Sequence, residues 1–168
     1  KNKIEPHPYY HDGKFHTEGS FEINSVTGWE LKYHGITIIG NEPSNLPFTV
    51  DWNLLVVKMK ENLNSYWVSW ATRPSRMIVM LSDWGIQWTV LTVLRQYYTF
   101  RENTVTTKRK AAEYALAHLP SHWYPLIQEA MEIREGRQEL HHRSKIVRMM
   151  EAVKFLKFVI QISNQEFP

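Results

Sequence analysis

Apolar residues recur every three or four positions through most of the chain after residue 51, and this spacing is typical of helices that each bury one face. Prolines, glycines and capping residues divide the pattern into five predicted helices, at residues 51–72, 74–101, 106–119, 121–136 and 144–162. The connections between them are short, so consecutive helices should run antiparallel. The sequence therefore predicts a mainly α fold, built as an antiparallel bundle of about five helices.

The apolar positions also predict which side chains face the core. The first helix is expected to bury a stripe of Leu54, Leu55, Met59, Leu63 and Trp67. The second helix is predicted to be central because it is apolar around much of its circumference, at Ile78, Leu81, Trp84, Trp88, Leu91, Leu94 and Tyr98. Gly85 within it marks a break or a close contact. The last helix is expected to bury Ile146, Met149, Met150, Val153, Leu156 and Ile160, and to solvate Lys145, Arg148, Lys154 and Lys157.

The first 50 residues do not continue the helical pattern. Residues 1–24 have no sustained period and are predicted to be loop and extended chain, followed by a short helix at 25–34 that ends at Gly35. Residues 36–39 (ITII) are β-branched and bounded by glycines, so they predict a short buried strand, and two prolines make residues 41–50 a loop. A lone strand must pair its backbone groups, so we expect its sheet to lie upstream of Lys1. We therefore divide the chain into 1–50, the end of another domain with a linker, and 51–168, a helical domain.

Composition narrows the class of protein. The formal charge of +3 is mild and does not by itself indicate a nucleic-acid partner. The chain has no cysteine, which removes disulfides and thiolate metal sites and fits a reducing cytoplasm. It has no apolar run of about 18 residues, so we expect no membrane span. His7, His11 and His16 with Asp12 lie in a loop without preorganised spacing, so no metal site is predicted.

From the residues alone, the first candidate site is the basic run that contains Lys108. Lys108 lies in a Thr-Thr-Lys-Arg-Lys run at 106–110, at the predicted start of a helix, where free backbone N–H groups and the positive end of the helix dipole gather. This arrangement suits a polyphosphate, although a capped helix with solvated basic residues explains it as well. The sequence has no Gly-Ser with a paired-aspartate D-x-D, no phosphate-cradling G-x-x-x-x-G-K and no G-x-G-x-x-G. A complete set of catalytic parts is therefore not predicted for this chain.

Arg137 and His142 support an alternative. Their Arg-x4-His spacing is similar to the motif of helical ribonucleases of the HEPN type, in which the histidine would act as acid and base and the arginine would hold the phosphate. A charged connection between two helices gives the same pattern. The alternative function is thus a stand-alone helical binding module or a ribonuclease.

Residues 90–136 carry a family resemblance. An L-x-R and aromatic-rich helix is followed by a lysine, an A-A-x-aromatic-A helix, Leu-Pro and a helix that closes in glycine. The matching residues are Leu94-Arg95, Tyr97-Tyr98, Lys108, Ala111-Ala112-Glu113-Tyr114-Ala115 and Leu119-Pro120. In this order the chain resembles the C-terminal domain of aminoglycoside adenylyltransferases of the streptomycin/spectinomycin type. Residues 26–43 look like the segment that ends the nucleotidyltransferase domain of that family.

The resemblance implies a parent enzyme that transfers AMP from ATP, with Mg²⁺, to a hydroxyl of an aminoglycoside or aminocyclitol, a reaction of antibiotic resistance. It implies a cleft shared with an upstream nucleotidyltransferase domain, which would supply the catalytic carboxylates and leave this chain alone inactive. Lys108 would bind the nucleotide phosphates. Asp83, Trp88 and Tyr97 are the predicted substrate-binding residues, and Trp84 and Trp88 are left open between a core and a ligand role.

Overall fold

A computed structural model describes residues 6–19, 24–137 and 144–167. Contacts between residues divide the chain into two compact units, Lys1–Leu55 and Val56–Pro168. Most of the described residues are helical, and the described strands form one two-stranded sheet. The prediction of a mainly α fold is therefore confirmed.

The first unit contains a β-hairpin that the sequence analysis missed. Strands β1 (Tyr9–His11) and β2 (Lys14–His16) pair antiparallel, and the two residues between them, Asp12 and Gly13, have φ values of 48° and 76°. A two-residue turn with positive φ at both positions matches the right-handed twist of paired strands. Loop and extended chain were expected here, but the pairing of the extended segments into a hairpin was not predicted. The Asp-Gly dipeptide was the available signal, because these residues adopt positive φ readily.

Helix α1 (Ser25–His34) follows, with the bounds expected from sequence. The Asn24 side chain accepts a hydrogen bond from the Thr27 backbone N–H at 3.0 Å, which satisfies one of the free donors of the first turn. The helix ends at Gly35, as predicted. Within the predicted loop at 41–50, residues Pro43–Asn45 form a short 3₁₀ turn.

The predicted strand at residues 36–39 is not formed. These residues are irregular, and the described part of the chain gives them no neighbouring strand. The three isoleucines in this segment are each at least 89% exposed. A β-branched run favours extended chain, but it becomes a strand only when another strand accepts and donates its backbone hydrogen bonds. The expectation of a buried strand is therefore wrong for this unit as described.

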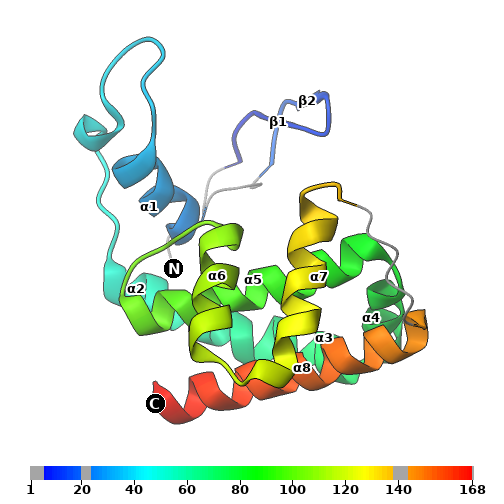
Figure 1. The fold of residues 1–168 in the computed structure, drawn as a ribbon. Coiled ribbons are helices and arrows are strands. Elements are labelled where there is room, and N and C mark those ends of the chain that lie inside the picture. The colour runs from blue at the N-terminus through cyan, green and yellow to red at the C-terminus, as the bar shows by residue number, and fades with distance from the viewer. Residues whose placement is uncertain (1–5, 20–23, 138–143, 168) are drawn as a thin grey trace. The chain divides into compact units, whose positions relative to one another are not determined.

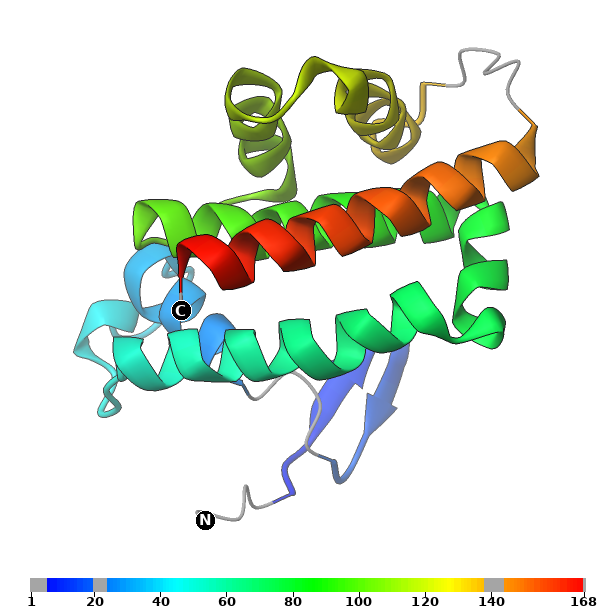
Figure 2. The same cartoon turned by 90° about the horizontal axis from the view of Figure 1, so that it is seen from below.

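The second unit is a helical bundle around α5 (Asp83–Glu102), which contacts α6 (Lys108–His118), α7 (Tyr124–Arg134) and α8 (Lys145–Glu166). In Figure 1, α6 and α7 stand on the same side of α5, and Figure 2 shows α8 running along it. The α5 side chains Ile86, Val90, Leu91, Val93 and Leu94 are fully buried. The sequence analysis correctly placed this segment at the centre.

Before α5, the chain runs through α2 (Trp52–Asn62), a π-helical turn at Leu63–Trp67 and α3 (Val68–Thr72). Asp51 caps α2, because its carboxylate accepts a hydrogen bond from the Leu54 N–H at 3.1 Å. This agrees with the predicted helix from residue 51 to 72. Leu54, placed in the predicted apolar stripe, is instead largely exposed.

The predicted continuous helix at 74–101 is broken. Helix α4 (Pro74–Met77) passes into a 3₁₀ turn at Ile78–Leu81, and α5 then leaves at a bend of 110° after Ser82. Gly85 permits the bend, since a Cβ at this position would lie 2.0 Å from the backbone oxygen of Val79. Gly85 is therefore a close contact, as predicted, whereas the uninterrupted helix was wrong. In the described residues no single helix has the length and apolarity to cross a membrane. Residues Pro74–Leu81 and Asp83–Glu102 reach that length and apolarity only when the two bent segments are taken together.

The buried face of α8 also differs from the prediction. Its buried residues are Arg148, Ala152, Phe155, Leu156, Val159 and Ser163. Ile146 and Met150, expected in the core, are exposed, and Arg148, expected in solvent, is only 6% exposed. Apolar residues on α8 form two adjacent stripes, and spacing alone does not choose between them. The ion pairs of Arg148 with groups on α5 and α7 belong to the stripe that the fold buries.

Candidate functional site

Lys108 is the first residue of α6, and Thr107 fixes this start. The Thr107 hydroxyl accepts a hydrogen bond from the Lys110 N–H at 3.2 Å, and its backbone oxygen accepts the Ala111 N–H at 3.0 Å. A threonine in this capping position ends the preceding loop and orients the first turn. The predicted helix start is confirmed, and it places Lys108 at the positive end of the α6 dipole.

The Lys108 ammonium group lies over an aromatic ring. Its Nζ is 4.4 Å from the centre of the Trp88 ring on α5, within the range of a cation–π interaction. Burial, followed by the positive charges of Arg134 and Arg95, lowers the pKa of Lys108 from 10.5 to about 8. A lysine held partly out of water beside two other cations is one that an anionic ligand would stabilise.

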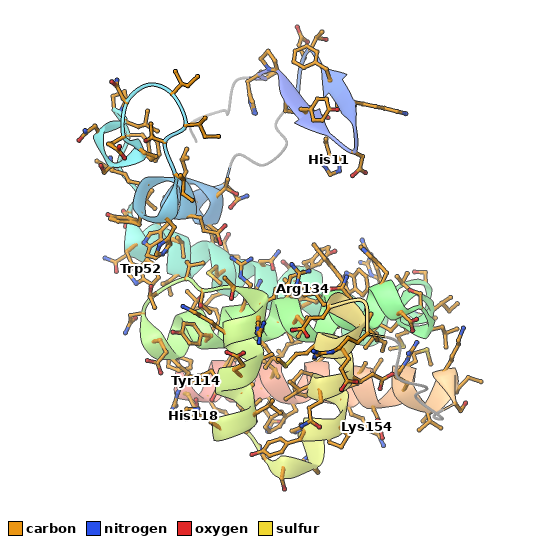
Figure 3. The ribbon with its side chains drawn as sticks, turned by 45° about the horizontal axis from the view of Figure 1, so that its top comes forward. His11, Trp52, Tyr114, His118, Arg134 and Lys154 are labelled. Carbon is orange, nitrogen blue, oxygen red and sulfur yellow. The ribbon has the colours of Figure 1, made fainter. Side chains whose placement is uncertain are left out.

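Three helices bring these cations together. Arg95 belongs to α5, Lys108 to α6 and Arg134 to α7, and we name the three residues the cationic cluster. Arg134 lies at the C-terminal end of α7 (Figure 3), where its Nη1 donates a long hydrogen bond of 3.4 Å to the Gln87 side chain. Guanidinium groups bind phosphate through paired donors, and the α6 N-terminus adds partial positive charge. The sequence analysis missed Arg134 as a site residue and used Arg95 only as a family marker.

A row of side chains continues from the cationic cluster along α5. Trp84, Trp88 and Arg95 are spaced by four and seven residues and so share one helix face. The rings of Trp84 and Trp88 stack, with centres 5.5 Å apart and planes within 8°. Trp84 is 55% exposed, so of the two roles left open for this residue, the core role does not hold. Trp88 is half-buried between Trp84 and Lys108, which leaves Trp84 as the ring of the pair most open to a ligand.

Asp83, the predicted substrate-binding carboxylate, lies beside Trp84 in the first turn of α5. Its Oδ1 is 2.8 Å from Nη1 of Arg148, while its side chain remains 57% exposed. The same Arg148 nitrogen is 3.0 Å from Oε1 of Glu129, which is only 2% exposed. Asp83 is therefore paired with an arginine and open to solvent at the same time.

Tyr97, the third predicted substrate-binding residue, lies among other neighbours. It is 3% exposed, and its pKa is raised first by burial and then by the charge of Glu166. Arg101 and Tyr114 also act on it, and none of these groups belongs to the cationic cluster. The structure thus places Lys108 and Trp88 in contact and Tyr97 in the core. The role of Tyr97 in substrate binding stays a prediction.

The residues of the ribonuclease alternative are only partly described. Arg137 forms an ion pair with Glu135, with Nη2 2.5 Å from Oε2, and His142 lies outside the described residues. Within the described ranges, no group of three or more His, Cys, Asp or Glu side chains is arranged to hold a metal ion.

A pocket lies in the first unit, and none of its lining residues is a predicted site residue. It encloses about 510 Å³ beside the first turns of α1 and α2. Its lining is mainly apolar, and it includes Leu31, Phe48, Val50 and Leu54. Asp51 is the one titratable residue among its lining residues, and its carboxylate already caps α2.

Comparison with known proteins identifies the helical part. Residues 75–158, half of the chain, match the family model described as the C-terminal domain of aminoglycoside adenylyltransferase. In a comparison with curated proteins, none matches the chain. The matched residues include α5, α6 and α7, and with them the whole cationic cluster, Trp84 and Trp88. The chain therefore belongs to the family of aminoglycoside adenylyltransferase C-terminal domains.

Proposed function

We propose that this helical domain binds the phosphates of ATP in an enzyme that transfers AMP to a hydroxyl of an aminoglycoside or aminocyclitol. The observation that carries the proposal is the position of Lys108 at the first turn of α6, over the Trp88 ring and near enough to Arg95 and Arg134 for their charges to lower its pKa. The family to which the chain belongs supports a transferase domain of this type.

The chemistry of nucleotidyl transfer needs such a cluster. An acceptor hydroxyl attacks the α-phosphorus of ATP, its proton leaves to a base, and the P–O bond to pyrophosphate breaks. Negative charge develops on the departing pyrophosphate, so fixed cations around it stabilise the transition state. Lys108 suits this role because a bound anion would stabilise the charged form that burial and two arginines disfavour.

The catalytic carboxylates and the Mg²⁺ ligands are proposed to come from a partner, the upstream nucleotidyltransferase domain. In support of this, the described residues contain no group of three or more His, Cys, Asp or Glu side chains that could hold a metal ion. We further propose that residues 36–39 pair with the sheet of that domain, in support of which their three exposed isoleucines have the composition of a strand. In this account the chain alone binds ATP and transfers nothing.

Asp83 and Trp84 are proposed to face the acceptor. An exposed indole ring packs well on the apolar face of a sugar or cyclitol ring, and a carboxylate pairs with its ammonium groups. Trp88, predicted from sequence to contact substrate, is proposed instead to support Trp84 on one side and Lys108 on the other.

Calorimetric titration of the chain with ATP tests the proposal. Lys108→Ala should weaken binding by about tenfold or more, since a hydrogen bond to a charged group contributes about 1.5–3 kcal/mol. Lys154→Ala is the matched control, because Lys154 is an exposed lysine on α8. Equal affinities of wild type and Lys108→Ala would refute phosphate binding by this cluster.

A further inference from the structure

Arg148 joins three helices and a turn through one guanidinium group. From α8 its Nη1 contacts Oε1 of Glu129 on α7 at 3.0 Å and Oδ1 of Asp83 on α5 at 2.8 Å. Its Nη2 donates a hydrogen bond to the backbone oxygen of Leu81, at the end of the 3₁₀ turn, at 3.1 Å. These contacts meet at the bend before α5, directly beside Trp84.

The charges in this group do not cancel. One guanidinium faces two carboxylates, which leaves one surplus negative charge. Arg148 and Glu129 are almost fully buried, at 6% and 2% exposure, whereas the Asp83 side chain is 57% exposed. The surplus is therefore accessible to a ligand at Asp83.

The group is costly to bury, which argues against a role in stability alone. Among the described residues, Arg148 Nε and Glu129 Oε2 are buried without a hydrogen-bond partner. A buried ion pair with incomplete hydrogen bonding is often no more stable than well-packed apolar side chains of similar volume. What the group does provide is a fixed carboxylate, because the contact with Arg148 restricts the rotation of Asp83. A preorganised group loses less conformational entropy when it binds a ligand.

We propose that Arg148 is a positioning residue that orients Asp83 toward the acceptor, and that Glu129 sets the net charge there at one negative unit. The site would then select an acceptor that carries an ammonium group beside its hydroxylated ring. This inference rests on the proposed function, since it assigns the acceptor to the Asp83–Trp84 end of the α5 row.

Binding of two cyclitols to the full chain tests the charge. The probes are 2-deoxystreptamine, which carries two ammonium groups, and scyllo-inositol, which carries none. Wild type should bind the first at least about tenfold more tightly in calorimetric or NMR titrations. Glu129→Gln keeps an oxygen that accepts from Arg148 but removes the surplus charge, so the affinity for 2-deoxystreptamine should fall about tenfold, the size expected for one charge about 10 Å away at an effective dielectric constant near 20. Glu61→Gln removes a carboxylate from an exposed pair with Lys58 on α2 and should leave the affinity unchanged.

A double variant tests the positioning. Arg148→Met with Glu129→Met replaces the buried pair by apolar side chains, which the fold should tolerate, and leaves the charge on Asp83 in place. A several-fold loss of affinity in a variant that melts like wild type supports orientation by Arg148. Wild-type affinity in this variant would overturn the positioning role. Equal binding of the two cyclitols by wild type, or undiminished binding by Glu129→Gln, would overturn the charge role.

Titration of the same samples with ATP separates this inference from the proposed function. The cationic cluster does not include Glu129 or Arg148. The double variant keeps the net charge and should bind ATP like wild type, and Glu129→Gln removes a negative charge and so should not weaken ATP binding. ATP binding with no preference between the cyclitols would sink only the inference. A wild-type chain that does not bind ATP would refute the proposed function as well.

Discussion

Raising the pH from 7 to 9 should weaken ATP binding by about tenfold through Lys108 alone. The pKa of this lysine is lowered to about 8 by burial and by the neighbouring charges of Arg134 and Arg95. About nine-tenths of Lys108 is then protonated at pH 7 and about one-tenth at pH 9. If the phosphates bind the protonated form, the apparent affinity follows this fraction. An ordinary lysine with a pKa near 10.5 would stay protonated over the same range.

Calorimetry across this pH range in buffers of different ionisation enthalpy is the assay. ATP binding should also take up protons near pH 8, because the bound phosphates raise the pKa of Lys108. Lys108→Arg is the matched variant: it keeps a positive charge at both pH values, so it should lose the pH dependence and report only the ionisation of ATP itself. The same decline with pH in wild type and in Lys108→Arg would refute the assignment to Lys108.

Three further predictions concern the fold that holds the site, and chemical denaturation measures each. Gly85→Ala should destabilise the fold by at least about 2 kcal/mol, because the added methyl group would meet a backbone oxygen at 2.0 Å. Gly28→Ala is the control and should not destabilise it, because its nearest neighbour would lie at 3.6 Å. Similar losses of stability in the two variants would contradict the close contact at Gly85. Arg148→Ala should cost about 3–5 kcal/mol, because it leaves a carboxylate buried without its counter-charge, and a loss below 1 kcal/mol would argue against this ion pair. Thr107→Ala should cost about 1 kcal/mol through the lost cap, and an unchanged unfolding midpoint would contradict that role.

The sequence predicted most helix ends because local chemistry determines them. Asp51 and Thr107 accept hydrogen bonds from first-turn N–H groups, and Pro120 stops α6, so neighbours in sequence were sufficient evidence. The break between α4 and α5 was missed because the apolar pattern runs through it. Only Gly85 marked it, and the reason for this glycine is a contact with a turn that folds back in space.

The site was harder to predict than the helices. Lys108 was found because it lies in a basic run at a helix start and in a family motif. Arg134 and Arg148 were missed because their roles depend on which residues of neighbouring helices they approach, and this follows from tertiary packing. A basic residue on an amphipathic helix is ordinarily solvated. Arg148 is buried instead, because it pairs with the buried carboxylate of Glu129.

NMR spectra of the chain during addition of ATP locate the binding site most directly. The indole N–H signal of Trp88, identified by its absence in Trp88→Phe, should shift together with the backbone amides of the first turn of α6. Signals from the exposed face of α8 around Lys154 should stay in place. ATP-dependent shifts that avoid both Trp88 and the start of α6 would contradict phosphate binding at the cationic cluster.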